Sequence, residues 1–325
     1  MGANDKGVVV GNVAVMTKVT CDPLLNEKLT GMCLVRLSLE RSGSSAEAVS
    51  IITDLLEKHG QGGPCAELEP TLGFHNTFVI ADQSEVWLLE TAGRLWAARL
   101  VKSGLMFVSN RFTIDKDFDR CSDGLKDKAK ELGLWDGSEP FSFKACFTDS
   151  ENAFKDREEA GKKLLSESGK HTAESFISIL RNVESGICET LDRTDSVTTG
   201  AQVSVLGLPG KRSLHWFTGT PDPSVSIFKP FVFVPGVGSC AMTMSPNVEN
   251  DPAKETPRFQ RKVERAHPLW QAHAAAFKAG RLPSEELREL ERNAVKEMAE
   301  LDGASEDILA DLFKDAVQSE MKFYE

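Results

Sequence analysis

The chain has 325 residues, is 41% hydrophobic and carries a formal net charge of −11, with an isoelectric point near 5.2. This acidic balance argues against a nucleic-acid-binding protein, because binding to phosphates requires clustered Lys and Arg. No apolar run approaches the roughly 20 residues that cross a bilayer, and the N-terminus lacks the basic-then-apolar order of a signal peptide. The composition therefore indicates a globular protein with a substantial core and no transmembrane segment.

The cysteines and histidines give no sign of a disulfide framework or a metal site. Seven cysteines, at positions 21, 33, 65, 121, 146, 188 and 240, form no CxxC pair. An odd number without such pairs favours reduced thiols in a cytoplasmic protein. The six histidines are dispersed and none has the HExxH spacing of a zinc site. We expect a cytoplasmic protein without a metal or an organic cofactor.

The N-terminal part begins with a strand and continues with two helices. Residues 7–15 predict a strand, which starts so close to Met1 that we consider Met1 an internal methionine of a longer parent chain. Residues 23–41 predict a helix with Leu25, Leu29, Cys33 and Leu37 on one face. Ser44 and Glu47 form a capping-box pattern for a second helix, which ends at His59 and Gly60.

Residues 74–110 predict four antiparallel strands in succession. The apolar runs 78–80, 86–89, 95–98 and 105–108 are separated by Gly, Asp and Ser, as in hairpins. The runs hardly alternate with polar residues, so we expect this sheet to be covered on both faces. It ends at Ser109, Asn110 and Arg111, where a buried strand gives way to polar side chains.

The remaining chain predicts further helices, a second β-rich block and a helical tail. Helices are expected over 124–132 and 154–168, and another after Thr172 with Phe176, Ile179, Leu180 and Val183 on its inner face. The strand candidates are 196–199, 201–206, 214–218 and 227–234, and the tail helices are 258–279, 284–301 and 305–322. The pattern is that of an α+β fold, with two antiparallel sheets and helices outside them.

Most residues that suggest chemistry also have a structural explanation. The loop Gly60–Gly63 lacks the Lys-Ser or Lys-Thr of a phosphate-binding loop, so it is explained as a helix C-cap and a flexible loop. Cys65 and Cys188 lie beside loop glycines, where a thiol is either reactive or buried and inert. His215, within an apolar run, is expected to be a core histidine, and Gly219–Ser224 either shapes a pocket or forms a structural turn.

Two asparagines are the best candidates for catalysis. Asn4 lies in a turn before the first strand, and Asn110 follows the strand expected over 105–108. A side-chain amide fixed at a strand end can donate a hydrogen bond to a developing oxyanion, which contributes several kcal/mol to acyl transfer. The common alternative is an asparagine that only forms a turn.

The whole chain resembles the secernin family, in the dipeptidase-like branch of the N-terminal-nucleophile cysteine hydrolases. The matching stretches are MGANDKGVVVGNVAV, LTGMCLVRLSLERS, LLEKHGQGG, EVWLLETAGRLWAA, ESGIC, FTGTPDPSVSIFKPFVF, DPAKETPRFQ and MKFYE. The resemblance implies an αββα sandwich over residues 1–248, followed by a helical C-terminal extension over 249–325.

The same resemblance implies an activity and its residues. It implies a cysteine-type exopeptidase that cleaves small peptide or amide bonds with a cysteine at the mature N-terminus, whose free α-amine is the general base. Asn4, in the motif MGxNxxG, and Asn110 would hold the oxyanion. No cofactor is implied.

One departure from the family pattern bears on activity. In the family the nucleophilic cysteine lies several dozen residues before the MGxNxxG motif, whereas this chain begins at that motif and its first cysteine, Cys21, has no such context. We therefore expect the fold of the family without its nucleophile, in an inactive form. The alternative is a non-catalytic interaction or regulatory protein that binds a partner through the helices of 258–322, although these helices are also explained as a solvated cap.

Overall fold

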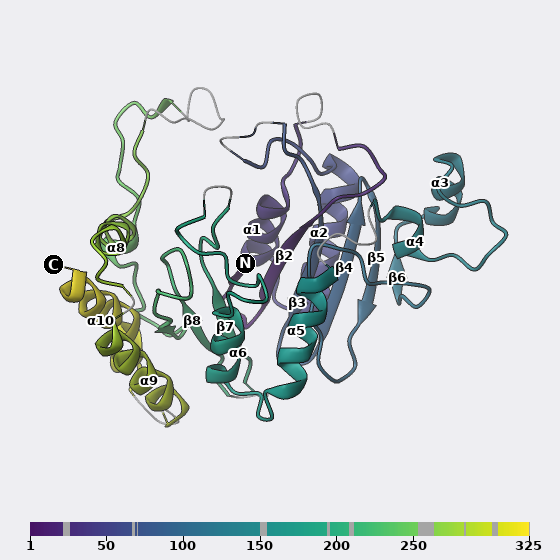
Figure 1. Cartoon of the computed structure of the whole chain (residues 1–325). Helices are drawn as coiled ribbons and strands as arrows, with labels where there is room; N and C mark the ends of the chain where they lie inside the picture. Colours follow the sequence, from purple (N-terminus) through teal and green to yellow (C-terminus); the bar gives the residue numbers. More distant parts are fainter. Residues whose placement is uncertain are drawn as a thin grey trace. The chain divides into compact units, whose positions relative to one another are not determined.

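The computed structural model divides the chain into two compact units, Met1–Glu159 and Ala160–Glu325 (Figure 1). It describes residues 1–21, 27–66, 69, 71–149, 155–193, 196–207, 211–252, 263–282, 284–300 and 305–324. Each unit has its own sheet, and the two units are described separately below. Both sheets are antiparallel, which confirms the α+β fold class.

The N-terminal unit is built on a six-stranded sheet whose strands follow one another in sequence order. The strands are β1 (Gly2–Ala3), β2 (Val9–Val15), β3 (His75–Ala81), β4 (Val86–Ala92), β5 (Leu95–Leu100) and β6 (Arg120–Cys121). Three of the four strands predicted over residues 74–110 are therefore confirmed. The helices α1 (Gly31–Arg41) and α2 (Ser45–His59) are inserted between β2 and β3.

Both faces of this sheet are covered, as its nearly continuous apolar runs predict. On one face, Phe78 and Leu89 pack with Leu34 of α1 and Ile52 of α2, all four fully buried, and Figure 1 shows the two helices side by side against the sheet. On the other face, Leu88 and Ala97 belong to a second core with Phe112 and Phe143. The short helices α3 (Leu125–Glu131) and α4 (Phe143–Phe147) close this second core.

The fourth predicted strand, residues 105–108, is wrong. These residues form no β-ladder, and Leu105 is half exposed. The edge of β5 that they would need is occupied by β6, which pairs Cys121 with Ala97 and Arg120 with Ala98. A partner from farther along the chain therefore displaces the nearer apolar run.

The helix predicted over 23–41 begins later than expected. Residues 22–26, which include Pro23 and Leu25, lie outside the described residues, and residues 27–30 are not helical. The backbone of Lys28 and Leu29 is bonded instead to Gly62, through Lys28 N to Gly62 O and Gly62 N to Leu29 O. Thr30 then caps the helix, because its hydroxyl accepts a hydrogen bond from the backbone N–H of Cys33.

The boundaries of α2 agree with the prediction from its caps. Ser44 accepts a hydrogen bond from the backbone N–H of Glu47, which is the first half of the capping box. The Glu47 carboxylate accepts from the N–H of Gly43, one residue before the expected one. The helix ends at Gly60, whose φ of 76° is a conformation that side chains with a Cβ rarely adopt.

The C-terminal unit has a three-stranded sheet of β7 (Gln202–Val205), β8 (Leu214–Phe217) and β9 (Lys229–Phe231). The strand predicted over 196–199 is wrong, because the backbone of Thr198 bonds to Glu189 and Asp222 instead of to a strand. The predicted helix after Thr172 is confirmed as α6 (Ala173–Leu180), with a capping box of Thr172 and Ser175.

The inner face of α6 differs in part from the prediction. Ile177 and Ile179 are buried, whereas Phe176 and Val183 are exposed. The charged helix predicted over 154–168 is present as α5 (Lys155–Glu167); Phe154 lies outside the described residues.

Three helices form the described part of the tail. They are α8 (Pro268–Lys278), α9 (Glu285–Glu300) and α10 (Glu306–Tyr324), and the 3₁₀ helix η1 (Ala241–Thr243) precedes them. Of these, α9 and α10 pack on the small sheet and α8 packs against α10. The first tail helix starts later than predicted, since 263–267 is not helical and 258–262 lies outside the described residues. Met298 of α9 and Leu309 of α10 share a core with Trp216 and Phe228. The division of the chain at residue 248 stays a prediction.

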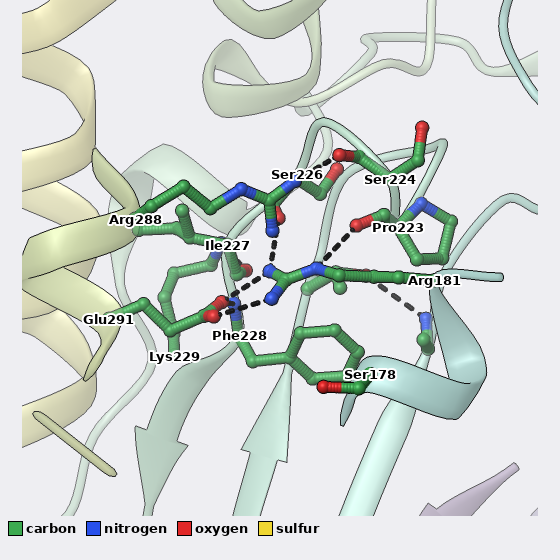
Figure 2. Close-up of polar contacts among 12 residues, drawn as sticks. Ser178, Arg181, Pro223, Ser224, Ser226, Ile227, Phe228, Lys229, Arg288 and Glu291 are labelled. Atoms are coloured by element: carbon green, nitrogen blue, oxygen red, sulfur yellow. Dashed lines mark hydrogen bonds and ion pairs between the residues drawn. The ribbon is translucent and has the colours of Figure 1, made fainter. Parts of the chain in front are cut away.

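An arginine near the end of α6 ties three parts of the C-terminal unit together (Figure 2). Arg181 donates to the carbonyls of Pro223 and Ser226 at 2.9 and 2.8 Å, and its two terminal nitrogens contact the Glu291 carboxylate of α9 at 2.7 and 2.6 Å. Glu291 also accepts from the backbone N–H of Phe228. This bidentate ion pair has a structural role, because the hydrogen bonds leave Arg181 few free donors for a ligand.

Across the described segments, no helix combines the length and the apolar character that crossing a membrane requires.

A hydrogen-bonded network of side-chain amides borders the core beneath α1 and α2. Asn76 is fully buried; its Nδ2 donates to Gln61 Oε1 at 2.9 Å, and its Oδ1 accepts from Asn12 Nδ2 at 2.9 Å. Gln61 donates onward to Gly93 O and accepts from the Thr91 hydroxyl. The first residue of α1, Gly31, approaches this network so closely that a Cβ there would lie 1.9 Å from Asn76 Oδ1.

We predict that Gly31→Ala destabilises the N-terminal unit by about 2–4 kcal/mol, because the new methyl group displaces the Asn76 amide and breaks buried hydrogen bonds. Chemical denaturation measures the change in the free energy of unfolding. The matched control is Gly43→Ala, whose Cβ would meet only Glu47 Oε2 at an ordinary 3.5 Å. An equal, small effect of both substitutions would show that Asn76 can move without loss.

Candidate functional site

The segment 110–114 crosses one face of the N-terminal sheet and is fastened at both ends. At one end, Asn110 Nδ2 donates to the carbonyl of Ala14 in β2 at 3.0 Å. At the other, the Glu90 carboxyl of β4 accepts from the backbone N–H groups of Thr113 and Ile114 at 2.6 and 3.0 Å. Since β3 lies between these strands, the segment spans about 10 Å, two strand spacings.

Asn110 is held in one orientation by two contacts. Its Oδ1 accepts a hydrogen bond from Arg157 Nη1 at 3.0 Å, and one hydrogen of Nδ2 is used by Ala14 O. The second amide hydrogen has no partner within the described ranges. A fixed, half-buried amide with one remaining N–H is the type of group that stabilises an oxyanion.

The first turn of α5 clamps the segment through two neighbouring residues. Arg157 contacts Asn110, and Glu158 contacts Arg111, with 3.2 Å between Arg111 Nε and Glu158 Oε2. Both side chains of the second pair are only 10% exposed, and the contact is an ion pair rather than an aligned hydrogen bond. Removing one member would leave a largely buried charge, which typically costs several kcal/mol.

Glu90 is the buried acid that positions this segment. It is fully buried and accepts three hydrogen bonds, two from backbone N–H groups and one from the Thr113 hydroxyl. Burial raises the pKa of Glu90 to about 7, while the hydrogen bonds from Thr113 and Ile114 act in the opposite direction. The charge of Glu90, at the other end of the segment from Asn110, therefore changes near neutral pH.

Asn4 is engaged entirely in holding the fold. Its Nδ2 donates to the carbonyls of Leu39 and Ser42, at 3.0 and 2.9 Å, where α1 ends. Its Oδ1 accepts from the backbone N–H groups of Lys6 and Val8. Both amide hydrogens are thus used, and the side chain joins the end of α1 to the start of β2.

The structure does not bring Asn4 and Asn110 together. Asn4 is bonded at Val8, just before β2, whereas Asn110 is bonded at Ala14, near the opposite end of this strand. Six residues of extended chain separate these points by roughly 20 Å. The two amides therefore cannot bind one oxyanion in this arrangement, and the catalytic role of each stays a prediction.

The edge of β2 beside Asn110 is open. β1 pairs only with Val9 and Val10, so in the part of the chain that is described, residues 11–15 have a strand partner on the β3 side alone. The Ala14 carbonyl that Asn110 contacts faces this open side, because alternate residues of a strand bond to the same side and the Val8 carbonyl, six residues earlier, accepts from Asn4 N on the β1 side. An open strand edge presents unpaired main-chain groups that another strand can bind.

The two cysteines with a possible reactive context are poor nucleophiles. Cys188 is buried beside Asp222, and burial raises the pKa of its thiol to about 11. Burial also raises the pKa of Cys65, whose thiol donates to Gly63 O at 3.3 Å. Both thiols therefore stay protonated near neutral pH, which favours the inert alternative.

The other candidate residues have structural roles. In the loop Gly60–Gly63, Gln61 supports the buried amide network rather than a phosphate. His215 is fully buried against the Ser204 hydroxyl, and burial lowers its pKa to about 4, so it is a neutral core histidine, as expected. In the turn 219–224, Asp222 accepts from the backbone of Ser224 and Leu191, which agrees with the structural alternative.

Sequence reasoning missed Glu90 and the pair Arg157 and Glu158. Glu90 had a usable signal, because it is the single acid within the apolar run of residues 86–92. Arg157 and Glu158 had none, since they belong to a helix charged along its whole length. Among the described residues, no group of three His, Cys, Asp or Glu side chains is arranged to hold a metal ion.

Comparison with known protein families gives one match. Residues 2–160 match the family model of Peptidase family C69. The matched range corresponds closely to the N-terminal unit, residues 1–159, and includes both Asn110 and the residues that hold it. The match supports a relationship of this unit to cysteine peptidases of the dipeptidase type.

We predict that the stability of the N-terminal unit depends on the protonation of Glu90. The folded pKa of about 7 lies above the ordinary 4.5, so the stabilisation is present below about pH 4.5 and is lost as the pH rises through 7. Relative to Glu90→Gln, the free energy of unfolding of the wild type should fall by roughly 3 kcal/mol over this window.

Denaturation curves at several pH values test this prediction. Glu139→Gln, at an exposed position, is the control and should leave the pH dependence unchanged. If the wild type instead becomes more stable relative to Glu90→Gln as the pH rises, the prediction is wrong. The three hydrogen bonds would then lower the pKa of Glu90 by more than burial raises it.

Proposed function

We propose, with the match of residues 2–160 to Peptidase family C69 as premise, that the protein is a secernin-like cysteine-type exopeptidase of the N-terminal-nucleophile class. Its substrates would be dipeptides or similar small amides. The observation that carries the proposal is the Asn110 amide, which is fixed by Ala14 and Arg157 inside the matched range.

Asn110 would act by donating its remaining amide hydrogen to the oxyanion of the tetrahedral intermediate. Such a donor is effective only when it is already oriented, because reorientation would cost the energy that the bond supplies. Arg157 and Glu90 would be positioning residues, since each acts on the location of Asn110 rather than on a substrate. Asn4 would instead stabilise the fold, because its hydrogen bonds join the end of α1 to the start of β2.

The nucleophile would come from outside the printed sequence. The two hydrogen bonds of Asn110 go to Ala14 and Arg157, and within the described residues no cysteine bonds to it. The raised pKa values of Cys65 and Cys188 argue against a thiolate at either position. The open edge of β2 lies beside Asn110 and suits a further strand. We propose that such a strand carries the cysteine, whose α-amine serves as general base.

This proposal includes the finer expectations drawn from the resemblance. The two antiparallel sheets would be those of an αββα sandwich, and the chain in its printed form would be weak or inactive. A cytoplasmic location and the absence of a cofactor stay predictions on the same ground.

The alternative of a non-catalytic interaction protein has less support. It places partner binding on the helices of residues 258–322. The described parts of these helices direct Leu269, Val295, Leu309 and Val317 into the cores of their own unit. These four side chains are therefore already used in packing, as in a helical cap, whereas Ile308 of α10 is exposed.

We predict no turnover of dipeptides by the printed chain, and turnover by a form that carries the family's upstream cysteine at its N-terminus. In that active form, Asn110→Ala should lower kcat by about 10²–10³-fold, because one oxyanion donor is lost. Asn293→Ala, an exposed helical position, is the control. Release of amino acids from unlabelled dipeptides measures the rates.

Two results would contradict the proposal. One is turnover by the printed chain that Cys65→Ala or Cys188→Ala abolishes. The other is an Asn110→Ala variant of the active form with unchanged kcat. Intact mass and N-terminal sequencing of the protein from its native cells would establish which form occurs there.

A further inference from the structure

Arg111, the residue after Asn110, has a nearly buried side chain without an aligned hydrogen bond. The side chain is 10% exposed, and its Nε is enclosed and lacks a hydrogen-bond partner. Glu158 lies 3.2 Å from this nitrogen, as an ion pair. Within the described residues, the two terminal nitrogens of Arg111 make no hydrogen bond either. A buried guanidinium ordinarily satisfies several of its five N–H groups, so this one indicates a ligand that the described chain does not supply.

The terminal nitrogens are the part of Arg111 that a small molecule can reach. Nε is the guanidinium nitrogen that is fully enclosed without a partner, whereas Nη1 and Nη2, which also lack one, keep some contact with solvent. Glu158 occupies the Nε side and restrains the guanidinium, and Arg157 places a second positive charge near Asn110. The edge formed by Nη1 and Nη2 fits a carboxylate, which accepts two parallel hydrogen bonds from an arginine.

The side chains of Asn110 and Arg111 are directed to the same turn of α5. Asn110 Oδ1 accepts from Arg157 at 3.0 Å, and Arg111 pairs with the next residue, Glu158. The backbone turns sharply at Asn110, because the N–H of Arg111 donates to the carbonyl of Ser109 at 2.8 Å, as in a γ-turn. The amide and the guanidinium are therefore held side by side against one helix.

We infer that Arg111 binds the C-terminal carboxylate of the substrate, so that the site takes amides with a single residue after the scissile bond. The inference rests on the proposed function for the role of Asn110. Asn110 and Arg111 are consecutive, with Cα atoms about 3.8 Å apart, and in a dipeptide the carboxylate carbon also follows the scissile carbonyl carbon by one residue. An amide for the oxyanion and a guanidinium for the carboxylate match this spacing.

This assignment makes Arg111 a specificity residue. A substrate with an amidated C-terminus, or with more residues after the scissile bond, offers no carboxylate at this position. The guanidinium would then stay without a hydrogen-bond partner while the substrate covers it. A site that leaves a buried polar group unpaired discriminates strongly against such an analogue.

Two variants of Arg111 test the inference. Arg111→Lys keeps the positive charge beside Glu158 but lacks the planar fork that holds a carboxylate with two bonds. The double variant Arg111→Gln and Glu158→Gln removes both charges together, so that neither is left buried alone. Arg36→Lys, on an exposed side chain that pairs with Glu40, is the matched control. Thermal unfolding midpoints establish that each variant is folded.

Binding is measured by isothermal calorimetry at neutral pH with the printed chain, which should bind the probes without consuming them. The probes are L-Ala-L-Ala and L-alanyl-L-alaninamide, which differ only in the C-terminal carboxylate. We expect the wild type and Arg36→Lys to prefer the dipeptide over the amide by at least about tenfold. Both Arg111 variants should bind the dipeptide about 10–100-fold more weakly, because hydrogen bonds between charged groups are lost.

Three results would overturn the inference. They are equal binding of the two probes by the wild type, an Arg111→Lys variant that keeps the preference for the carboxylate, and no binding of either probe.

The proposed function has a separate measurement, the turnover by the active form. If this form cleaves no dipeptide although the preference that depends on Arg111 is present, the hydrolase proposal fails and the carboxylate site stands. If it cleaves both probes with equal kcat/KM, the hydrolase proposal stands and the assignment of Arg111 fails.

Discussion

A single buried carboxyl group, that of Glu90, joins the middle of the N-terminal sheet to the segment that carries Asn110 and Arg111. The group has three hydrogen-bond donors around it and no exposed surface, so the segment cannot move without leaving a buried acid unsatisfied. The apolar residues Phe112 and Ile114 then fill the core on either side of Thr113. The orientation of Asn110 therefore depends on a residue two strands away.

The parts of the fold that could be predicted from the sequence are those set by local chemistry. The strands β3, β4 and β5 were found because Gly, Asp and Ser end them, and α2 was found from Ser44 and Gly60. The wrong predictions occur where a segment distant in the sequence competes for the same backbone hydrogen bonds. Residues 105–108 lose the edge of β5 to β6, and residues 28–29 pair with Gly62 instead of extending α1. Apolar pattern alone contains no information on such competition.

The candidate site shows the same limit. Asn110 was recognisable as a polar stop after an apolar run, and the structure gives it a fixed orientation. Asn4 was recognisable by its motif, but its four hydrogen bonds depend on where α1 ends, which the motif does not specify. The separation of the two amides along β2 follows from strand register, and register is set by tertiary pairing.

The open edge of β2 restricts what can bind to it. Main-chain groups of a strand face alternate sides, so Val10, Asn12 and Ala14 direct theirs to the same edge. Val10 is already paired with Gly2, and the Ala14 carbonyl is already bonded to Asn110. Within the part of the chain that the structure describes, no strand pairs with this edge at Asn12, which lies between the two occupied positions with both main-chain groups available. A docking strand can therefore form its hydrogen-bonded pair only at Asn12, and because directly paired residues of neighbouring strands point to the same face of a sheet, the docked residue opposite Asn12 lies on the same face as the Asn12 side chain.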